Sequence, residues 1–460
     1  VLLTPIVTRM YLPEAFGLAN LLGSFVMTIA VFSTMGYHGA IILPKNDATA
    51  TNILILCFLS IFCVSAISFL IIMVAKDIIA VELNSPSLVN YLWLTPIFVF
   101  LHGLNMTLRY WTTRLRQFNS LAASRISEIV VRKTYQISAG FLGFATAESL
   151  IYASIATGIV KSLVLIRGLE LKTITLNYFY TKLIVVAIRY KKFPQFSIWA
   201  DLFSRIPAVI ISIFIIKYFG QSMLGFYALS LMVLSLPSTL ISGSISEAFS
   251  RVAMAKHNNK QTEMLEKLYV RLVAIMIFPF LILGIFGDRL FLIVFGPEWM
   301  QSGIIAQILV IRIFLEIIFS PSLSLVAIMN RQELNLISSI VSSLISVIAM
   351  LLGAYYNNFY LVLWCLVILE GATITILSSY MMRFIHFPFI HSMKKLSKYV
   401  FISIFIGFST FLIGDLFPVN NIYFISTIFF SFLIYYSLVA YWDREMTIAI
   451  AKSIRSFVKI

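Results

Sequence analysis

The chain has 460 residues, of which 60% are apolar and only 12% are charged, and its mean hydropathy is +0.97. A soluble domain is roughly half apolar and a quarter charged, so this composition excludes a soluble enzyme and makes lipid the solvent. The 34 Lys and Arg residues outnumber the 19 Asp and Glu residues, giving a net charge of +15. In a membrane protein such an excess first indicates which loops face the cytoplasm, so it does not predict a nucleic-acid partner.

Apolar runs long enough to cross a bilayer, about 20 residues each, recur along the chain. Residues 1–10 are apolar but lack the basic beginning of a signal peptide, and we interpret them as the outer end of a first helix that starts upstream. Thirteen further runs follow, over residues 16–43, 52–75, 88–108, 121–142, 145–166, 198–218, 223–246, 270–287, 303–328, 335–356, 358–382, 397–417 and 421–441. The sequence therefore predicts an all-α polytopic membrane protein with about 14 transmembrane helices, the first one truncated.

The basic residues between these runs indicate the orientation of the chain. Twenty-four of the 34 Lys and Arg residues follow even-numbered helices, whereas four follow odd-numbered helices: Arg9, Lys76, Lys217 and Arg289. Because cytoplasmic loops collect Lys and Arg, both termini are expected in the cytoplasm. Two of the inward stretches, 167–197 and 247–269, are long and basic. They are expected to be solvated, with contact to anionic lipid as the alternative.

A short internal repeat suggests how the helices are grouped. The segment Gly17–Leu22 resembles Gly225–Ser230 six spans later, and each follows a basic residue eight positions earlier. An even number of intervening spans keeps both copies in one orientation, which indicates a parallel repeat. The expected divisions are an N-terminal lobe over 1–190 (helices 1–6), a C-terminal lobe over 191–392 (helices 7–12), and residues 393–460, with helices 13 and 14 and a cytoplasmic tail.

Charged residues within the span 121–142 are the strongest functional signal, because an ionisable group inside a membrane is costly. Arg125, Glu128 and Arg132 share one helical face, and Lys133 follows them. Glu128 could simply neutralise one arginine. However, a net charge of +2 remains after that pairing, so we expect a cationic, water-filled cavity for an anionic substrate. Pyrophosphate suits such a cavity because an arginine fork engages its oxygens in pairs.

Other charges within spans fall into two groups. Asp201 with Arg205 and Arg312 with Glu316 are spaced to form i,i+4 pairs that hold helices together. Glu370 has no basic residue in its own span, so it is either protonated and hydrogen-bonded across the bundle or part of a coupling-ion site. The ion-coupling candidates are Glu370, Glu316 and Glu128. No cofactor and no metal site are expected, apart from coupling to H⁺ or Na⁺, because no metal-ligand spacing and no phosphate loop occur.

Several motifs resemble one membrane protein family. They are Arg9-x-Tyr11-Leu12-Pro13-Glu14-Ala15-Phe16-Gly17, Leu43-Pro44-Lys45, Lys192-Phe193-Pro194, Leu224-Gly225-Phe226-Tyr227-Ala228, Leu236-Pro237-Ser238 and, the most specific, Phe286-Gly287 with Phe295-Gly296-Pro297-Glu298-Trp299 and Ser302-Gly303. The chain is similar to the lipid-linked oligosaccharide flippases, the O-antigen translocase branch of the multidrug/oligosaccharidyl-lipid/polysaccharide exporter superfamily.

This resemblance implies two six-helix lobes in a V, in the bacterial cytoplasmic (inner) membrane. It implies alternating access that moves undecaprenyl-pyrophosphate-linked oligosaccharide repeat units to the outer leaflet, for O-antigen, capsule or exopolysaccharide assembly. Its expected partners are that lipid-linked oligosaccharide, membrane lipids and other polysaccharide-assembly proteins. The resemblance also implies a basic central cavity and carries Arg125 and Arg205 into it. The full set of predicted substrate-binding residues is Arg125, Arg132, Lys133, Arg205 and Arg9.

Two alternatives remain. A membrane polysaccharide polymerase or ligase would also be basic and polytopic, but it is expected to work on a large outward loop, and the outward connections here are short. A multidrug exporter of the same superfamily usually carries cations, which the positive charges of residues 121–142 would repel. The sequence therefore favours a transporter that is not an enzyme.

Overall fold

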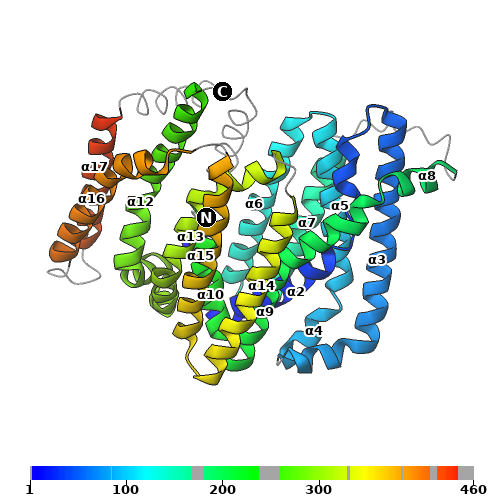
Figure 1. Cartoon of the computed structure of the whole chain (residues 1–460). Helices are drawn as coiled ribbons and strands as arrows, with labels where there is room; N and C mark the ends of the chain where they lie inside the picture. The colour runs from blue at the N-terminus through cyan, green and yellow to red at the C-terminus, as the bar shows by residue number, and fades with distance from the viewer. Residues whose placement is uncertain are drawn as a thin grey trace. The chain divides into compact units, whose positions relative to one another are not determined.

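A computed structural model describes residues 3–83, 85–167, 181–237, 259–328, 332–384, 387–414 and 422–443 of the chain. The regular secondary structure of these residues is entirely helical (Figure 1), which confirms the all-α prediction. Ten described helices are long and apolar enough to cross a membrane, or eleven if Pro86–Leu92 and Thr95–Arg114, bent by 55°, form one span. The chain is thus a multi-pass membrane protein, and the count of about 14 is not confirmed. The predicted spans 1–10, 223–246, 397–417 and 421–441 lie partly outside the described residues, as do the stretches 167–197 and 247–269.

The chain divides into two compact units, Val1–Ala228 with Ser339–Phe359, and Leu229–Ser338 with Tyr360–Ile460. The first unit contains most of the N-terminal helices: α1 (Thr4–Thr8), α2 (Pro13–Ala30), η1 (Tyr37–Ile42), α3 (Asp47–Glu82), η2 (Pro86–Leu88), α4 (Val89–Leu92), α5 (Thr95–Arg114), α6 (Phe118–Phe141), α7 (Ala147–Arg167), α8 (Thr181–Arg189), η4 (Phe193–Ser197) and α9 (Ile198–Phe219). The grouping into lobes over 1–190, 191–392 and 393–460 stays a prediction.

Helix starts in the first unit follow ordinary capping rules. Pro13 opens α2, where its missing N–H is not needed, and Glu14 stands in the first turn beside the positive end of the helix dipole. At the start of α3, Asn46 accepts a hydrogen bond from the backbone N–H of Ala48 at 2.9 Å. The sequence therefore marks these two helix starts locally, before any packing is considered.

Small residues allow the helices of this unit to pack closely, as is common between membrane helices. A Cβ on Gly103 of α5 would lie 2.7 Å from Cγ1 of Ile61, and one on Gly158 of α7 would lie 3.2 Å from Cδ1 of Leu101. α6 packs along α7, and α7 also contacts α5 and α2. These four helices surround the candidate site described below.

The two copies of the internal repeat touch each other where α2 and α10 (Gln221–Leu234) begin. A Cβ on Gly17 would collide with the backbone carbonyl of Gln221, and one on Gly225 would collide with that of Pro13. Ser222 donates a hydrogen bond to Glu14 at 2.6 Å. Each residue of the second copy stands 208 positions after its counterpart in the first, so the contacts are reciprocal. Reciprocity of this kind is what a two-fold relation between the two segments produces.

The second unit is built from α12 (Asn259–Phe295), η5 (Pro297–Trp299), α13 (Met300–Ile328), α15 (Phe359–Phe384), α16 (Phe389–Gly414), α17 (Ile422–Trp442) and part of α14 (Gln332–Tyr355). Phe278 and Tyr435 stack at 4.6 Å in its core, and the Tyr435 hydroxyl donates to the carbonyl of Ala274 at 2.6 Å. Arg271 of α12 forms two hydrogen bonds, of 2.7 and 2.8 Å, with Asp443 just after α17. α17 is thus tied to α12 by aromatic packing and by an ion pair.

Candidate functional site

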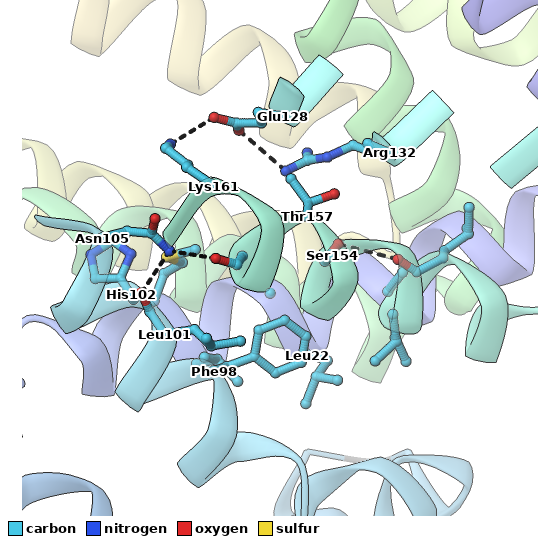
Figure 2. A pocket seen from close by; sticks show the side chains of 17 residues that line it. Leu22, Phe98, Leu101, His102, Asn105, Glu128, Arg132, Ser154, Thr157 and Lys161 are labelled. Carbon is cyan, nitrogen blue, oxygen red and sulfur yellow. Dashed lines mark hydrogen bonds and ion pairs between the residues drawn. The ribbon is translucent and has the colours of Figure 1, made fainter. Parts of the chain in front are cut away.

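A cavity of about 300 Å³ lies among α2, α5, α6 and α7 of the first unit (Figure 2). Its lower part in Figure 2 is apolar and includes Leu22, Phe98 and Leu101. α6 and α7 contribute the charged side chains, because both helices interrupt their apolar runs with ionisable residues on the faces that meet here. The cavity therefore combines an apolar wall with a charged one.

Three charged groups form a compact cluster on that wall. Glu128 of α6 accepts from Lys161 Nζ of α7 at 2.6 Å, and from Arg132 Nη2, one turn further along α6, at 3.4 Å. The side chains of Lys161, Glu128 and Arg132 are 24%, 30% and 42% exposed, so the cluster is only partly screened by water. One carboxylate shared by two cations leaves a net charge of +1 facing the cavity. The arrangement can bind an anion that competes with Glu128.

Further polar side chains from α5 and α7 line the same cavity. His102, Asn105, Ser154 and Thr157 all line the cavity. The Asn105 amide nitrogen donates to the carbonyl oxygens of Leu101 at 2.8 Å and Gly158 at 3.1 Å, which fixes the amide between α5 and α7. Figure 2 shows Asn105 and His102 close together, below Lys161. Side chains of this type can hydrogen-bond hydroxyl groups of a bound molecule.

The structure brings two of the predicted residues into the cavity, Arg132 and Glu128, and adds Lys161. Arg125 is exposed on α6, one turn before Glu128, and does not line this cavity. Lys133 also does not line it, because its Nζ donates to the side-chain oxygen of Gln136 at 3.2 Å instead.

Arg205 and Arg9 lie at other places in the same unit. Arg205 is half-buried in α9 and does not line the cavity. Arg9 is exposed and caps the C-terminal end of α1. For Arg125, Lys133, Arg205 and Arg9, a substrate-binding role stays a prediction.

The remaining acidic candidates belong to the second unit, where they share one arginine. Arg312 of α13 contacts Glu370 of α15 at 2.8 Å and Glu316, one turn further along α13, at 3.7 Å. The i,i+4 pair between Arg312 and Glu316, one of the two expected from the sequence, is thus confirmed. Glu370, which has no basic residue in its own helix, is paired across the bundle with an arginine, and its side chain is only 9% exposed.

Sequence reasoning had not placed Lys161, His102 and Asn105 among the binding residues. Lys161 could be recognised as a basic residue inside an apolar run, but Glu128 stands 33 residues earlier. Only the packing of α6 on α7 pairs them. His102 and Asn105 carried no signal, because a single polar residue in an apolar helix is commonly a packing residue.

Comparisons with known proteins agree with this architecture. Residues 6–304 match the family model described as polysaccharide biosynthesis protein. A relative, the teichuronic acid biosynthesis protein TuaB of Bacillus subtilis, is 23% identical over 306 residues. That match covers 65% of this chain and 61% of TuaB, so the chain spans less than two thirds of its curated relative.

Two solved structures share the fold. The lipid II flippase MurJ in an inward closed conformation superimposes with a TM-score of 0.72, at 14% identity, over 97% of each chain. An inward-facing multidrug resistance MATE family transporter of the MOP superfamily superimposes with a TM-score of 0.64, at 13% identity, over 84% of this chain and 93% of that one. Since the family model covers well over half of the chain, the protein belongs to the polysaccharide biosynthesis protein family, with the fold of that exporter superfamily, as its motifs predicted.

Proposed function

We propose that this protein flips undecaprenyl-pyrophosphate-linked oligosaccharide repeat units from the cytoplasmic to the outer leaflet of the bacterial cytoplasmic membrane, with both termini in the cytoplasm. The observation that carries the proposal is the pair of cations, Lys161 and Arg132, held by a single carboxylate inside a cavity. A pyrophosphate carries more negative charge than Glu128 and can take over both cations. The similarity of the fold to that of a lipid II flippase supports a flippase-type function.

In this proposal, different side chains of the cavity bind different parts of the substrate. Pyrophosphate oxygens would bind Lys161 and the Arg132 fork, which release Glu128 when substrate arrives. The first sugar would then lie against His102 and Asn105, whose polar atoms suit hydroxyl groups. Substrate binding therefore exchanges the ion pairs with Glu128 for ion pairs with the pyrophosphate and leaves the Glu128 carboxylate without these two cations.

Coupling to an H⁺ or Na⁺ gradient is part of the proposal. Protonation of Glu128 would free both cations for substrate, and Glu370 and Glu316 offer a second acidic pair around Arg312. If Glu370 couples flipping to an ion, Glu370→Gln will abolish the dependence of flipping on the gradient while leaving the protein inserted. Flipping by this variant that still follows the gradient would exclude Glu370 from coupling.

We propose a transporter and not a polymerase or ligase, because the cavity is built around a cluster of charged side chains that suits binding of an anion. Other polysaccharide-assembly proteins are the expected partners, since the flipped units must be joined after they cross. Loss of a polymerase would leave flipped but unjoined units at the outer face. Loss of a flippase would instead leave units that have not been flipped at the cytoplasmic face.

Cells that lack the gene therefore provide a direct test. Lipid-linked oligosaccharide should accumulate at the cytoplasmic face, where sugar-binding probes reach it only in inverted vesicles. Wild-type protein and Lys217→Gln, an exposed lysine in the last turn of α9, should both clear it. Lys161→Gln at equal membrane abundance should not. Accumulation at the outer face, or clearance by Lys161→Gln, would contradict the proposal.

A further inference from the structure

The short helix α8 has two apolar faces, one of them buried and the other exposed among the described residues. Leu183 and Val186 point inward and are 9% and 6% exposed. Val186 joins a buried cluster with residues of η1 and α3 that include Ile53 and Cys57. On the opposite side, Ile184, Val185 and Ile188 are 56%, 63% and 60% exposed. The nine described residues of α8 rise only about 14 Å as a helix, about half the thickness of the hydrocarbon core of a bilayer.

The position of α8 indicates the membrane depth of its open face, which is formed by Ile184, Val185 and Ile188. Val186 packs near the first three turns of α3, which begins after Asn46 and the basic residue Lys45, on the expected cytoplasmic side. Figure 1 shows α8 lying obliquely across the first half of α3. A helix that crosses the spans close to their cytoplasmic ends lies in the interfacial region of that leaflet.

Basic and aromatic side chains follow directly after the open face. Arg189 in the last turn of α8 and the next two lysines, Lys191 and Lys192, are all exposed. Trp199, in the first turn of α9, is 51% exposed. Exposed Ile and Val side chains next to Lys, Arg and Trp are typical of helices that lie in an anionic membrane surface.

The segment after α8 is firmly attached to the bundle. Phe193 packs against Gly39, where an added Cβ would lie 3.1 Å from the phenyl Cε1. Its carbonyl oxygen approaches Gly36, whose φ of +71° also favours glycine. Since η4 leads straight into α9, whatever holds α8 also positions the start of α9.

We propose that α8 and the basic residues Arg189, Lys191 and Lys192 form an interfacial anchor that binds anionic phospholipid headgroups of the cytoplasmic leaflet. The open apolar face fits acyl chains, and the three cations fit anionic headgroups just above them. The anchor does not depend on the proposed transport function, because it uses none of the side chains that line the cavity.

Lipid preference tests the headgroup contacts in the full-length chain reconstituted in nanodiscs. Association of spin-labelled phosphatidylglycerol relative to spin-labelled phosphatidylcholine should fall about two- to fivefold in the variant Arg189→Gln/Lys191→Gln/Lys192→Gln, since one basic residue near the surface contributes up to about fivefold and boundary lipid elsewhere around the protein dilutes the effect of the three that are removed. The control Lys76→Gln/Lys217→Gln removes two exposed cations on the expected outer side and should keep the wild-type ratio. A triple variant that also keeps the wild-type ratio overturns the proposal.

A depth measurement tests the apolar face without altering the three cations. Cys57, Cys63 and Cys365 are first replaced, and a spin label is placed at Ile188→Cys or, separately, at Lys191→Cys. The label at residue 188 should be accessible to oxygen and protected from a water-soluble nickel chelate, and the label at residue 191 should show the reverse. Equal exposure of both labels to the chelate would show that this face meets water and is open to a protein partner, which also overturns the proposal.

Discussion

Glu128→Gln tests whether the Glu128 carboxylate competes with substrate for Lys161 and Arg132 or only neutralises them. In the substrate-free protein, Glu128 occupies the cations that the substrate needs, through contacts of 2.6 Å to Lys161 and 3.4 Å to Arg132. At charge-assisted contacts of about 2.7–2.9 Å, a phosphate oxygen and a Glu128 oxygen on opposite sides of one cation would lie roughly 5 Å apart. Two like charges at that distance repel by about 1 kcal/mol in water and about 3 kcal/mol at an effective dielectric constant of 20.

Because Glu128 is 30% exposed, the repulsion should lie towards the lower end of this range. Its removal should then tighten binding of a pyrophosphate by about tenfold, which corresponds to roughly 1.4 kcal/mol. Flipping should become slower, because the tightly held substrate no longer has a carboxylate to displace it. Isothermal titration of the purified protein with geranyl pyrophosphate, at fixed ionic strength, measures the affinity.

The matched control is Glu148→Gln, which removes the same charge from an exposed position in the first turn of α7, away from this cavity. Its affinity for geranyl pyrophosphate should stay within about twofold of wild type, since an exposed charge is well screened. If Glu128→Gln remains folded and binds no more tightly than wild type, Glu128 does not compete with substrate. The reasoning about the shared carboxylate would then be wrong.

Three further substitutions test contacts outside the cavity, in both units. Burial raises the pKa of Tyr11 above its ordinary value of 10.0, so its phenol stays protonated and donates a hydrogen bond to the carbonyl of Gln136. Tyr11→Phe should therefore lower the free energy of unfolding by about 1–2 kcal/mol at neutral pH, as measured by denaturant titration. An unchanged free energy of unfolding would refute this role of the hydrogen bond. Gly225→Ala should force α10 away from the carbonyl of Pro13 and increase labelling of nearby engineered cysteines from the outer side, whereas unchanged labelling would contradict the close contact. Arg312→Gln should destabilise the protein by about 3–5 kcal/mol, because the buried Glu370 carboxylate loses the arginine that pairs with it. Adding Glu370→Gln to this variant should restore most of the lost stability. If the double variant is no more stable than Arg312→Gln alone, the two residues do not act as a buried ion pair.

The sequence predicted the helical class, the family and the charged helix well, because each depends on local signals. Apolar length marks a span, and ionisable residues such as Arg132 and Glu128 stand out within one. The partner of Glu128 could not be predicted in the same way. Helical spacing ranks Arg132 as its neighbour, but the shorter contact, 2.6 Å, comes from Lys161 on another helix.

Helical spacing also does not predict which face of a helix lines the cavity. Lys133 follows Arg132 directly, yet its contact is with Gln136, because successive residues of a helix point about 100° apart. Glu370 illustrates the same limit in the second unit, where the missing basic partner stands on α13. Pairing between helices depends on tertiary packing, which a single sequence records only weakly.

The most direct test of the account is flipping by the purified protein in proteoliposomes. A fluorescent, sugar-bearing polyprenyl pyrophosphate is incorporated into both leaflets, and a membrane-impermeant quencher reports how much reaches the accessible leaflet over time. Wild-type protein and Lys217→Gln should move the lipid across the bilayer, and Lys161→Gln should do so at least tenfold more slowly. Movement no faster than in protein-free vesicles, or equal rates for Lys161→Gln and wild type, would contradict the central claim that the cations of this cavity carry a lipid pyrophosphate across the membrane.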